Sequence, residues 1–261
     1  MKLEVLVAAM HQTDLSLASR MNIRTDALII NQCNSNAQAE MTEQGRTVRM
    51  LSLTDRGVGK SRNSALMQAT GDICLMADDD EIFVDDYEIL VLAAFQKNPA
   101  ADLIFFNVES HGGRRPVPMI KSSQRIRKHN CLRYGTFNMA FRRSRILKRN
   151  VFFSLLFGGG APYGHGEDSL FIWECLSKGL VAYARPDKIA DMNQVESTWF
   201  TGFNEKYFFD QGVFFGALSK AGAVPLILQY AVRHHALYKN DISLVSACRH
   251  MLRGLKHFQA L

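Results

Sequence analysis

Short apolar runs alternate with helix-forming segments over the first 110 residues, and this alternation limits the fold more than any other feature. The apolar runs have the length of buried strands and lie at 3–10, 26–30, 47–53, 72–77 and 102–108. The helix-forming segments between them lie at 14–21, 61–69 and 85–96. Strand, helix and strand at this spacing form right-handed βαβ units. The pattern therefore predicts an α/β fold with a mostly parallel central sheet flanked by helices.

The pattern becomes irregular after residue 110. Glycines and prolines at 112–118 indicate a loop, and residues 136–141 are compatible with a returning strand. A further helix-forming segment follows at 168–178, and the chain reads as helical from about residue 204 to its end. We therefore expect a main domain over 1–203, with halves at 1–110 and 111–203, and a helical C-terminal extension over 204–261.

Composition excludes several classes of protein. Hydrophobic residues make up 47% of the chain and charged residues 21%, which is typical of a globular protein. The cysteine count of five is odd and includes no Cys-x-x-Cys pair, which argues for a reducing compartment and against a disulfide framework or zinc site. Because no apolar run reaches the ~18 residues of a spanning helix, we expect a cytoplasmic protein, soluble or peripheral at a membrane.

Basic residues are concentrated between 111 and 150, where there are twelve Lys or Arg and no acid. This stretch has two interpretations: a solvated face, or a surface for an anionic partner such as a diphosphate, a membrane or a nucleic acid. Aromatic residues are sparse there, which argues against a stacking platform for single strands. We therefore expect no nucleic-acid partner.

Four consecutive acids follow the fourth apolar run: Asp78, Asp79, Asp80 and Glu81. Such a cluster repels itself unless a cation or hydrogen-bond donors offset its charge. Hard oxygen ligands suit Mg²⁺ or Mn²⁺, which would bridge to a substrate diphosphate. The alternative is an exposed acidic turn at the start of the next helix, and the cluster alone does not separate the two.

The residues before the cluster resemble the family 2 glycosyltransferases, which have the GT-A (nucleotide-diphospho-sugar transferase) fold. In that family a glycine-containing turn, an Arg-Asn-x-small helix start, a small-x-Gly-acid turn, an apolar strand and an Asp-x-Asp motif follow in order. Here the same order appears, with Arg62-Asn63 in the helix and Gly71 in the second turn. The resemblance covers roughly residues 1–200. Counted from Gly71, it implies that Asp78 and Asp80 hold a divalent Mg²⁺ or Mn²⁺.

The resemblance also implies a set of residues that contact a nucleotide-sugar donor. They lie at strand ends and in the acidic and glycine turns: Ala8, Asn31, Lys60, Arg62, Asn63, Asp78, Asp79 and Asp80. Relatives usually have acids at the end of the second strand, where this chain has Asn31, which hydrogen-bonds without a charge. A uridine or thymidine diphosphate sugar is the donor that we expect. A P-loop interpretation of residues 57–61 lacks the required first glycine, because Thr54 stands there.

A second acidic pair, Glu167-Asp168, follows a glycine-rich stretch. Acids favour a helix start, which is its simplest explanation. By resemblance, however, Asp168 would be the general base that deprotonates the acceptor hydroxyl, and Glu167 would bind or orient the acceptor. The same resemblance makes Gly159, Gly160, His165 and Gly166 acceptor-binding. Many relatives supply a metal-binding histidine late in the fold, but residues 190–199 contain none.

The C-terminal segment from 220 to 261 has six Lys or Arg, four histidines and one acid. Its amphipathic pattern predicts helices that pack on the catalytic domain or, alternatively, contact a membrane peripherally.

Together these features predict an inverting glycosyltransferase that moves a sugar to a hydroxyl of a glycan or lipid-linked acceptor, in surface polysaccharide biosynthesis. Residues 1–110 would bind the nucleotide sugar and residues 111–203 the acceptor. The alternatives are a nucleotidyltransferase or P-loop-like NTP-using enzyme, and a nucleotide-binding module without chemistry.

Overall fold

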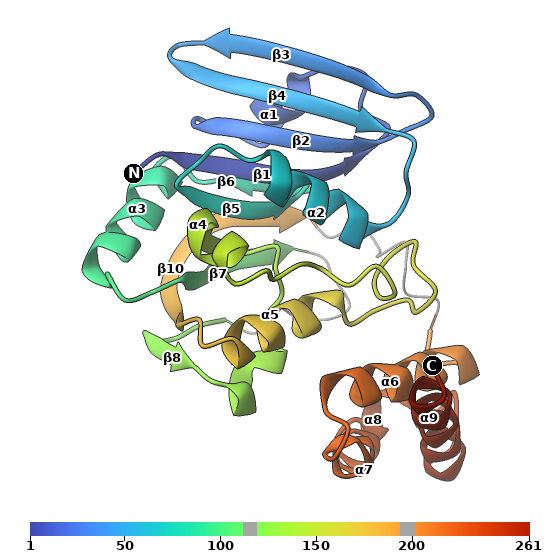
Figure 1. Ribbon diagram of the computed structural model, residues 1–261. Helices are drawn as coiled ribbons and strands as arrows, with labels where there is room; N and C mark the ends of the chain where they lie inside the picture. Colours follow the sequence, from blue (N-terminus) through green and yellow to red (C-terminus); the bar gives the residue numbers. More distant parts are fainter. Residues whose placement is uncertain (112–118, 194–201) are drawn as a thin grey trace.

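The computed structural model describes residues 1–111, 119–193 and 202–261, in which ten strands form one twisted sheet (Figure 1). Their order is β3-β4-β2-β1-β5-β9-β7-β10-β6, and β8 pairs with β10. The strands are β1 (Leu3–Met10), β2 (Asp26–Gln32), β3 (Ala37–Glu43), β4 (Arg46–Leu53), β5 (Ile73–Asp78), β6 (Glu81–Phe83), β7 (Leu103–His111), β8 (Gln124–Ile126), β9 (Met139–Arg142) and β10 (Ala182–Asn193). The helices are α1 (Ser16–Arg20), α2 (Val58–Gln68), α3 (Tyr87–Lys97), α4 (Arg143–Lys148), α5 (Glu167–Ser177), α6 (Glu205–Leu218), α7 (Ala223–Arg233), α8 (His235–Tyr238) and α9 (Leu244–Gln259).

The first half of the chain builds the parallel part of the sheet. Strands β4, β2, β1 and β5 are parallel neighbours, as the βαβ pattern predicts. The second half departs from that pattern, because β9 lies antiparallel between β5 and β7, and β6 and β8 pair antiparallel with β10. The sheet as a whole is therefore mixed rather than mostly parallel.

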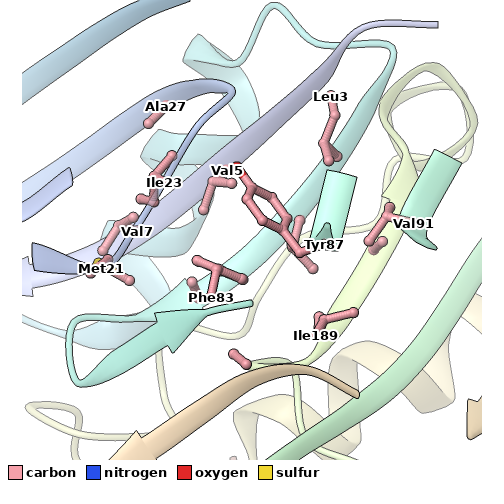
Figure 2. Close-up of a cluster of buried hydrophobic side chains, with 14 of the residues drawn as sticks. Leu3, Val5, Val7, Met21, Ile23, Ala27, Phe83, Tyr87, Val91 and Ile189 are labelled. Carbon is pink, nitrogen blue, oxygen red and sulfur yellow. The ribbon is translucent and has the colours of Figure 1, made fainter. Parts of the chain in front are cut away.

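Two apolar layers cover the two faces of the sheet. Alternate residues of each strand point to opposite faces, so Leu3, Val5 and Val7 of β1 enter one layer, while Leu6 enters the other. Helices α1 and α3 cover the first face, where Tyr87 of α3 lies beside Val5 and Phe83 (Figure 2). Helices α2, α4 and α5 cover the second face.

The residues after 203 form the predicted helices, with their own apolar cluster around Phe208, Ile227 and Met251. Helices α6 and α9 approach each other closely at two glycines. A Cβ on Gly212 would lie 1.9 Å from the Met251 carbonyl oxygen, and one on Gly254 would lie 2.0 Å from the Phe209 carbonyl oxygen. No helix in the described part of the chain has the length and apolar character needed to cross a bilayer.

Candidate active site

The two acidic motifs meet at the edge of the sheet where β5 ends. Asp78 is the last residue of β5, and Glu167 and Asp168 are the first two residues of α5. Arg62 extends from α2 between them and is buried, with 7% of its side chain exposed. The structure therefore places residues more than a hundred positions apart in one cluster.

Arg62 contacts three carboxylates. Its Nη2 lies 3.2 Å from Oδ1 of Asp78, and its Nη1 lies 3.2 Å from Oε1 of Glu167 and 2.5 Å from Oδ1 of Asp168. Burial lowers the pKa of Arg62, but the three carboxylates more than offset this effect and raise the pKa. The guanidinium is therefore a permanent positive charge that joins the two acidic motifs.

Thr136 fixes the Asp168 carboxylate from the other side. The Thr136 hydroxyl donates to Oδ1 of Asp168 at 2.7 Å, and its backbone N–H donates to Oδ2 at 3.1 Å. Sequence reasoning missed this role, because residues 136–141 showed only the pattern of a strand. With Arg62 and Thr136 in place, both oxygens of Asp168 have a defined direction.

Close backbone contacts dock α2 against the segment before α5. A Cβ on Gly59 would lie 2.4 Å from the Ser154 carbonyl oxygen, so only glycine permits this approach. The Asn63 side chain donates to the Phe153 carbonyl at 2.9 Å and accepts from the Phe153 N–H at 2.8 Å. These contacts place Arg62 within reach of α5.

The predicted acceptor residues lie in a loop held between α2 and α6. Gly159 accepts a hydrogen bond from the Val58 N–H at 2.9 Å, and Gly160, with φ +77°, packs against Gly57. His165 is hydrogen-bonded through Nε2 to Gln211 at 2.8 Å.

Gly166 is the last residue of this loop and directly precedes α5. It has φ +111° and packs against the Phe214 ring, so a side chain there would clash. Both ends of the glycine-rich loop therefore depend on backbone conformations or contacts that larger residues would disturb.

The acidic turn after β5 carries more negative charge than the neighbouring groups neutralise. Glu81 is buried and accepts the Asp78 N–H at 2.8 Å, while its Oε2 has no hydrogen-bond partner among the described residues. Burial raises the pKa of Glu81 well above its ordinary value, and the charge of Asp78 raises it further. The same two causes, in the same order, raise the pKa of Asp80 to about 6. The pKa of Asp79 is raised as well, mainly by burial. Such a carboxylate set fits a divalent cation that prefers oxygen ligands, which Asp78 and Asp80 would hold.

A second group of potential metal ligands lies at the ends of β7 and β10: Glu109, His111 and Asp191. His111 Nε2 lies 2.6 Å from Oδ1 of Asp191, and Lys188 contacts both carboxylates at 2.8 and 2.7 Å. Sequence reasoning missed this group, because His111 read as the start of the basic stretch. Relatives often have a metal-binding histidine in the region that corresponds to residues 190–199, and residues 194–199 lie outside the described part of the chain. Arg114 and Arg115 of the basic stretch also lie outside it.

Comparison with known proteins identifies the family. The sequence model described as glycosyl transferase family 2 matches residues 2–154. The chain belongs to this family. It is therefore a glycosyltransferase, and its mixed sheet with flanking helices is the GT-A fold.

Solved structures of Staphylococcus aureus TarS have a similar fold to this family 2 enzyme. TarS 1–349 in complex with UDP-GlcNAc superposes with a TM-score of 0.69 at 16% sequence identity, over 99% of this chain and 80% of that chain. TarS 1–349 in complex with UDP gives a TM-score of 0.64 over 100% of this chain and 83% of that chain, again at 16% identity. No curated protein sequence matches the enzyme closely enough to count as a relative.

The predicted donor residues of this family 2 enzyme do not all lie at an open surface. Asn31 is fully buried, where it accepts from the Gln12 N–H at 2.9 Å and donates to Ser52 Oγ at 3.0 Å. Its burial does not support the predicted direct contact with the donor. The two side-chain bonds of Asn63 to Phe153 likewise give it a role in docking α2.

The remaining donor candidates lie at the expected strand and helix ends. Ala8 pairs with Asp78 across β1 and β5, so it is next to the acidic turn. Lys60 is exposed and pairs with Asp55 at 2.9 Å. The P-loop interpretation fails structurally, because α2 already begins at Val58 and Gly59 is packed against Ser154 rather than lining a loop.

Proposed function

We propose that this enzyme transfers a sugar from a nucleoside diphosphate donor to a hydroxyl of a glycan or lipid-linked acceptor, with inversion at the anomeric carbon. The observation that carries the proposal is the contact of Arg62 with both acidic motifs. Through Arg62, the proposed base Asp168 lies near Asp78, which with Asp80 would bind the metal and diphosphate. A nucleotide-binding module without chemistry would have no need of that juxtaposition.

Asp168 would act as the general base. As the acceptor oxygen attacks the anomeric carbon, its proton moves to the Asp168 carboxylate and the bond from that carbon to the β-phosphate oxygen breaks. The nucleoside diphosphate leaves with the electron pair. A bound Mn²⁺ or Mg²⁺ would supply charge stabilisation for this leaving group. Thr136 orients Asp168, and Glu167 contributes to the acceptor side.

A uridine diphosphate sugar is the donor that we propose, with a thymidine diphosphate sugar as the second choice. Support comes from TarS, whose structures contain UDP-GlcNAc and UDP and share the fold. We further propose that the enzyme acts in the cytoplasm, in surface polysaccharide synthesis. Its five cysteines are all free, which agrees with a reducing compartment.

The test of the base assignment is Asp168→Asn. Transfer should fall by roughly 10²–10⁴-fold, because the amide cannot accept the acceptor proton, while donor affinity changes little. Asp241→Asn, an exposed carboxyl in the C-terminal segment, should leave transfer unchanged. Full transfer by the Asp168→Asn variant would refute the assignment.

Thermal unfolding with a panel of sugar nucleotides, with and without Mn²⁺, tests the donor and metal. A donor at a hundred times its dissociation constant should add ~2.7 kcal/mol to the free energy of unfolding. Asp80→Asn should remove the Mn²⁺-dependent part of that gain. Stabilisation by nucleoside triphosphates, with their consumption and no need for a sugar nucleotide, would favour a nucleotidyltransferase instead.

A further inference from the structure

Exposed apolar side chains are concentrated in the C-terminal helices. Among the described residues, sixteen large apolar side chains are exposed, and seven of them belong to residues 204–261. Packing against α6 does not account for them, because they remain outside the apolar cluster that joins the helices. The concentration of exposed apolar surface in this short segment indicates an interaction face.

Helix α9 has two distinct faces. One face packs inward through Ala247, Met251 and Leu255. The opposite face is a shallow groove of apolar surface lined by Leu244, Val245, Cys248, Arg249, Leu252, Arg253 and Lys256. The helix contains no Asp or Glu. Its outer surface therefore combines an apolar stripe with three cations whose long stems extend the apolar area.

Helix α7 adds a second apolar stripe. Val224, Leu228 and Val232 are spaced four residues apart and are all exposed, so they line one side of the helix. Ile227 and Ala231, on the other side, are buried in the cluster shared with α9. Figure 1 shows both helices below α6, at the end of the molecule opposite β3.

We propose that these two apolar stripes, Val224, Leu228 and Val232 on α7 and Val245 and Leu252 on α9 with Arg249 and Arg253 beside them, dock the enzyme on an anionic lipid bilayer. The apolar side chains enter the boundary between headgroups and acyl chains. The arginines remain at the level of the phosphates. The charge of the whole segment agrees, because residues 220–261 carry six Lys or Arg against the single acid Asp241.

The same charges disfavour a second copy of this chain as the occupant. A self-complementary contact through this face would bring the positive charges of two copies of α9 close together, and α9 itself contains no acid to pair with them. An anionic bilayer satisfies the apolar stripe and the cations at once. The bilayer is therefore the partner that this chemistry fits.

Docking through α7 and α9 would place the loop from 157 to 166, which contains the proposed acceptor residues, close to the bilayer. Helix α6 connects the two parts, because Asp210 accepts the Gly164 N–H at 3.0 Å and Gln211 is hydrogen-bonded to His165. This arrangement favours a lipid-linked acceptor over a soluble glycan. The preference for that acceptor rests on the proposed sugar transfer. The docking itself requires no chemistry.

Flotation of the full chain with vesicles, without any sugar donor, tests the docking separately from catalysis. The enzyme should float with vesicles that contain phosphatidylglycerol and bind pure phosphatidylcholine vesicles much more weakly. Val245→Glu should reduce binding at least tenfold. Ile89→Glu is the matched control, because Ile89 on α3 and Val245 are both 69% exposed. Ile89→Glu should bind as the unmodified chain does, and both variants should keep its melting temperature.

A second pair of variants tests the cations. Arg249→Gln with Arg253→Gln should weaken binding roughly thirtyfold, at about fivefold for each basic residue near an anionic surface. Lys121→Gln with Arg125→Gln removes two exposed cations of the catalytic domain and should have little effect. Failure of the full chain to bind anionic vesicles, or equal loss in the control pair, would overturn the proposal. So would a stable dimer in light scattering that Val245→Glu dissociates.

Discussion

Glu167 is a carboxyl held where its ionised form is disfavoured. Burial, and next the charge of Asp168, raise its pKa to about 7, although Arg62 opposes this rise. A folded-state pKa above the unfolded value means that stability is present at low pH. It is lost as pH rises from about 4.5 through about 7. The enzyme therefore gives up stability to keep an acid next to Asp168, the proposed base, as functional sites commonly do.

Glu167→Gln removes the group that ionises, and its effect on stability should depend on pH. At pH 5 the variant and the unmodified chain should have similar free energies of unfolding. At pH 8 the variant should be more stable by ~1–3 kcal/mol, since each pKa unit corresponds to about 1.36 kcal/mol. Urea unfolding at both pH values in the presence of a chelator measures this difference. The control Glu174→Gln changes a half-buried carboxyl on the same helix and should show no such trend. A gain of equal size at both pH values would contradict the prediction.

Thr136 orients Asp168, the proposed base, through its hydroxyl and its backbone N–H. Thr136→Val keeps the shape of the side chain but removes the hydroxyl that donates to Asp168 at 2.7 Å. Since a hydrogen bond to a charged group is worth about 1.5–3 kcal/mol, kcat should fall roughly 10- to 100-fold, with little change in the KM for the donor. Thr136→Ser should restore most of kcat, whereas a merely structural role would leave Ser and Val equivalent.

The residues that sequence reasoning found are those whose neighbours in the chain mark them. Asp78 and Asp168 stand within motifs of fixed order, so their meeting in space could be predicted. Thr136 and His111 have no local signal, because their roles come from residues far along the chain. Asn31 has the predicted position at a strand end, but its side chain is hydrogen-bonded to Gln12 and Ser52 within the core.

At the scale of elements, predictability follows burial. Strands β1, β2, β5 and β7 are mostly buried and apolar, so their runs stood out in the sequence, whereas β4 is buried only at alternate residues. Strand β3 is an exposed edge strand, held by its hydrogen bonds to β4 rather than by apolar side chains. Strand β10 contains Arg, Pro, Asp and Lys, and it is specified by pairing with β7 on one side and β6 and β8 on the other. Pairing of this kind leaves no periodic pattern.

The docking of α2 is the element-level feature that holds the site together. In Gly59→Ala the new methyl group would meet the Ser154 carbonyl, so α2 must move away and take Arg62 with it. Unfolding should cost ~1–3 kcal/mol less despite the better helix propensity of alanine, and transfer should fall. Chemical denaturation and a transfer assay measure both effects. Ser64→Ala, on the same helix, should be neutral or slightly stabilising. Unchanged stability and transfer in Gly59→Ala would show that this contact does not position Arg62.

At the scale of the whole molecule, the C-terminal helices are structurally continuous with the candidate site. The loop from 157 to 166 contacts α2 on one side and α6 on the other, so it depends on both parts of the chain. Tyr163 in this loop also hydrogen-bonds to His257 of α9 at 3.0 Å. A division of the molecule at residue 203 therefore separates this loop, which contains the proposed acceptor residues, from half of its support.

Asp210 is the residue that tests this dependence. It is buried on α6 and accepts hydrogen bonds from the Gly164 N–H at 3.0 Å and from Lys206 at 2.6 Å. Asp210→Ala leaves the Gly164 N–H without its partner, so the loop should lose its fixed position. We expect kcat/KM for the acceptor to fall at least tenfold, while donor affinity, measured by equilibrium binding, stays the same.

The matched control for Asp210→Ala is Glu174→Ala. Glu174 forms the same kind of ion pair with a lysine four residues away, Lys178, but its side chain is more exposed. Loss of that surface pair should change stability by less than ~1 kcal/mol and leave turnover intact. If both variants lost turnover equally, the effect would come from helix stability in general. If Asp210→Ala kept full acceptor turnover, the loop would not need α6, and the C-terminal helices would serve docking alone.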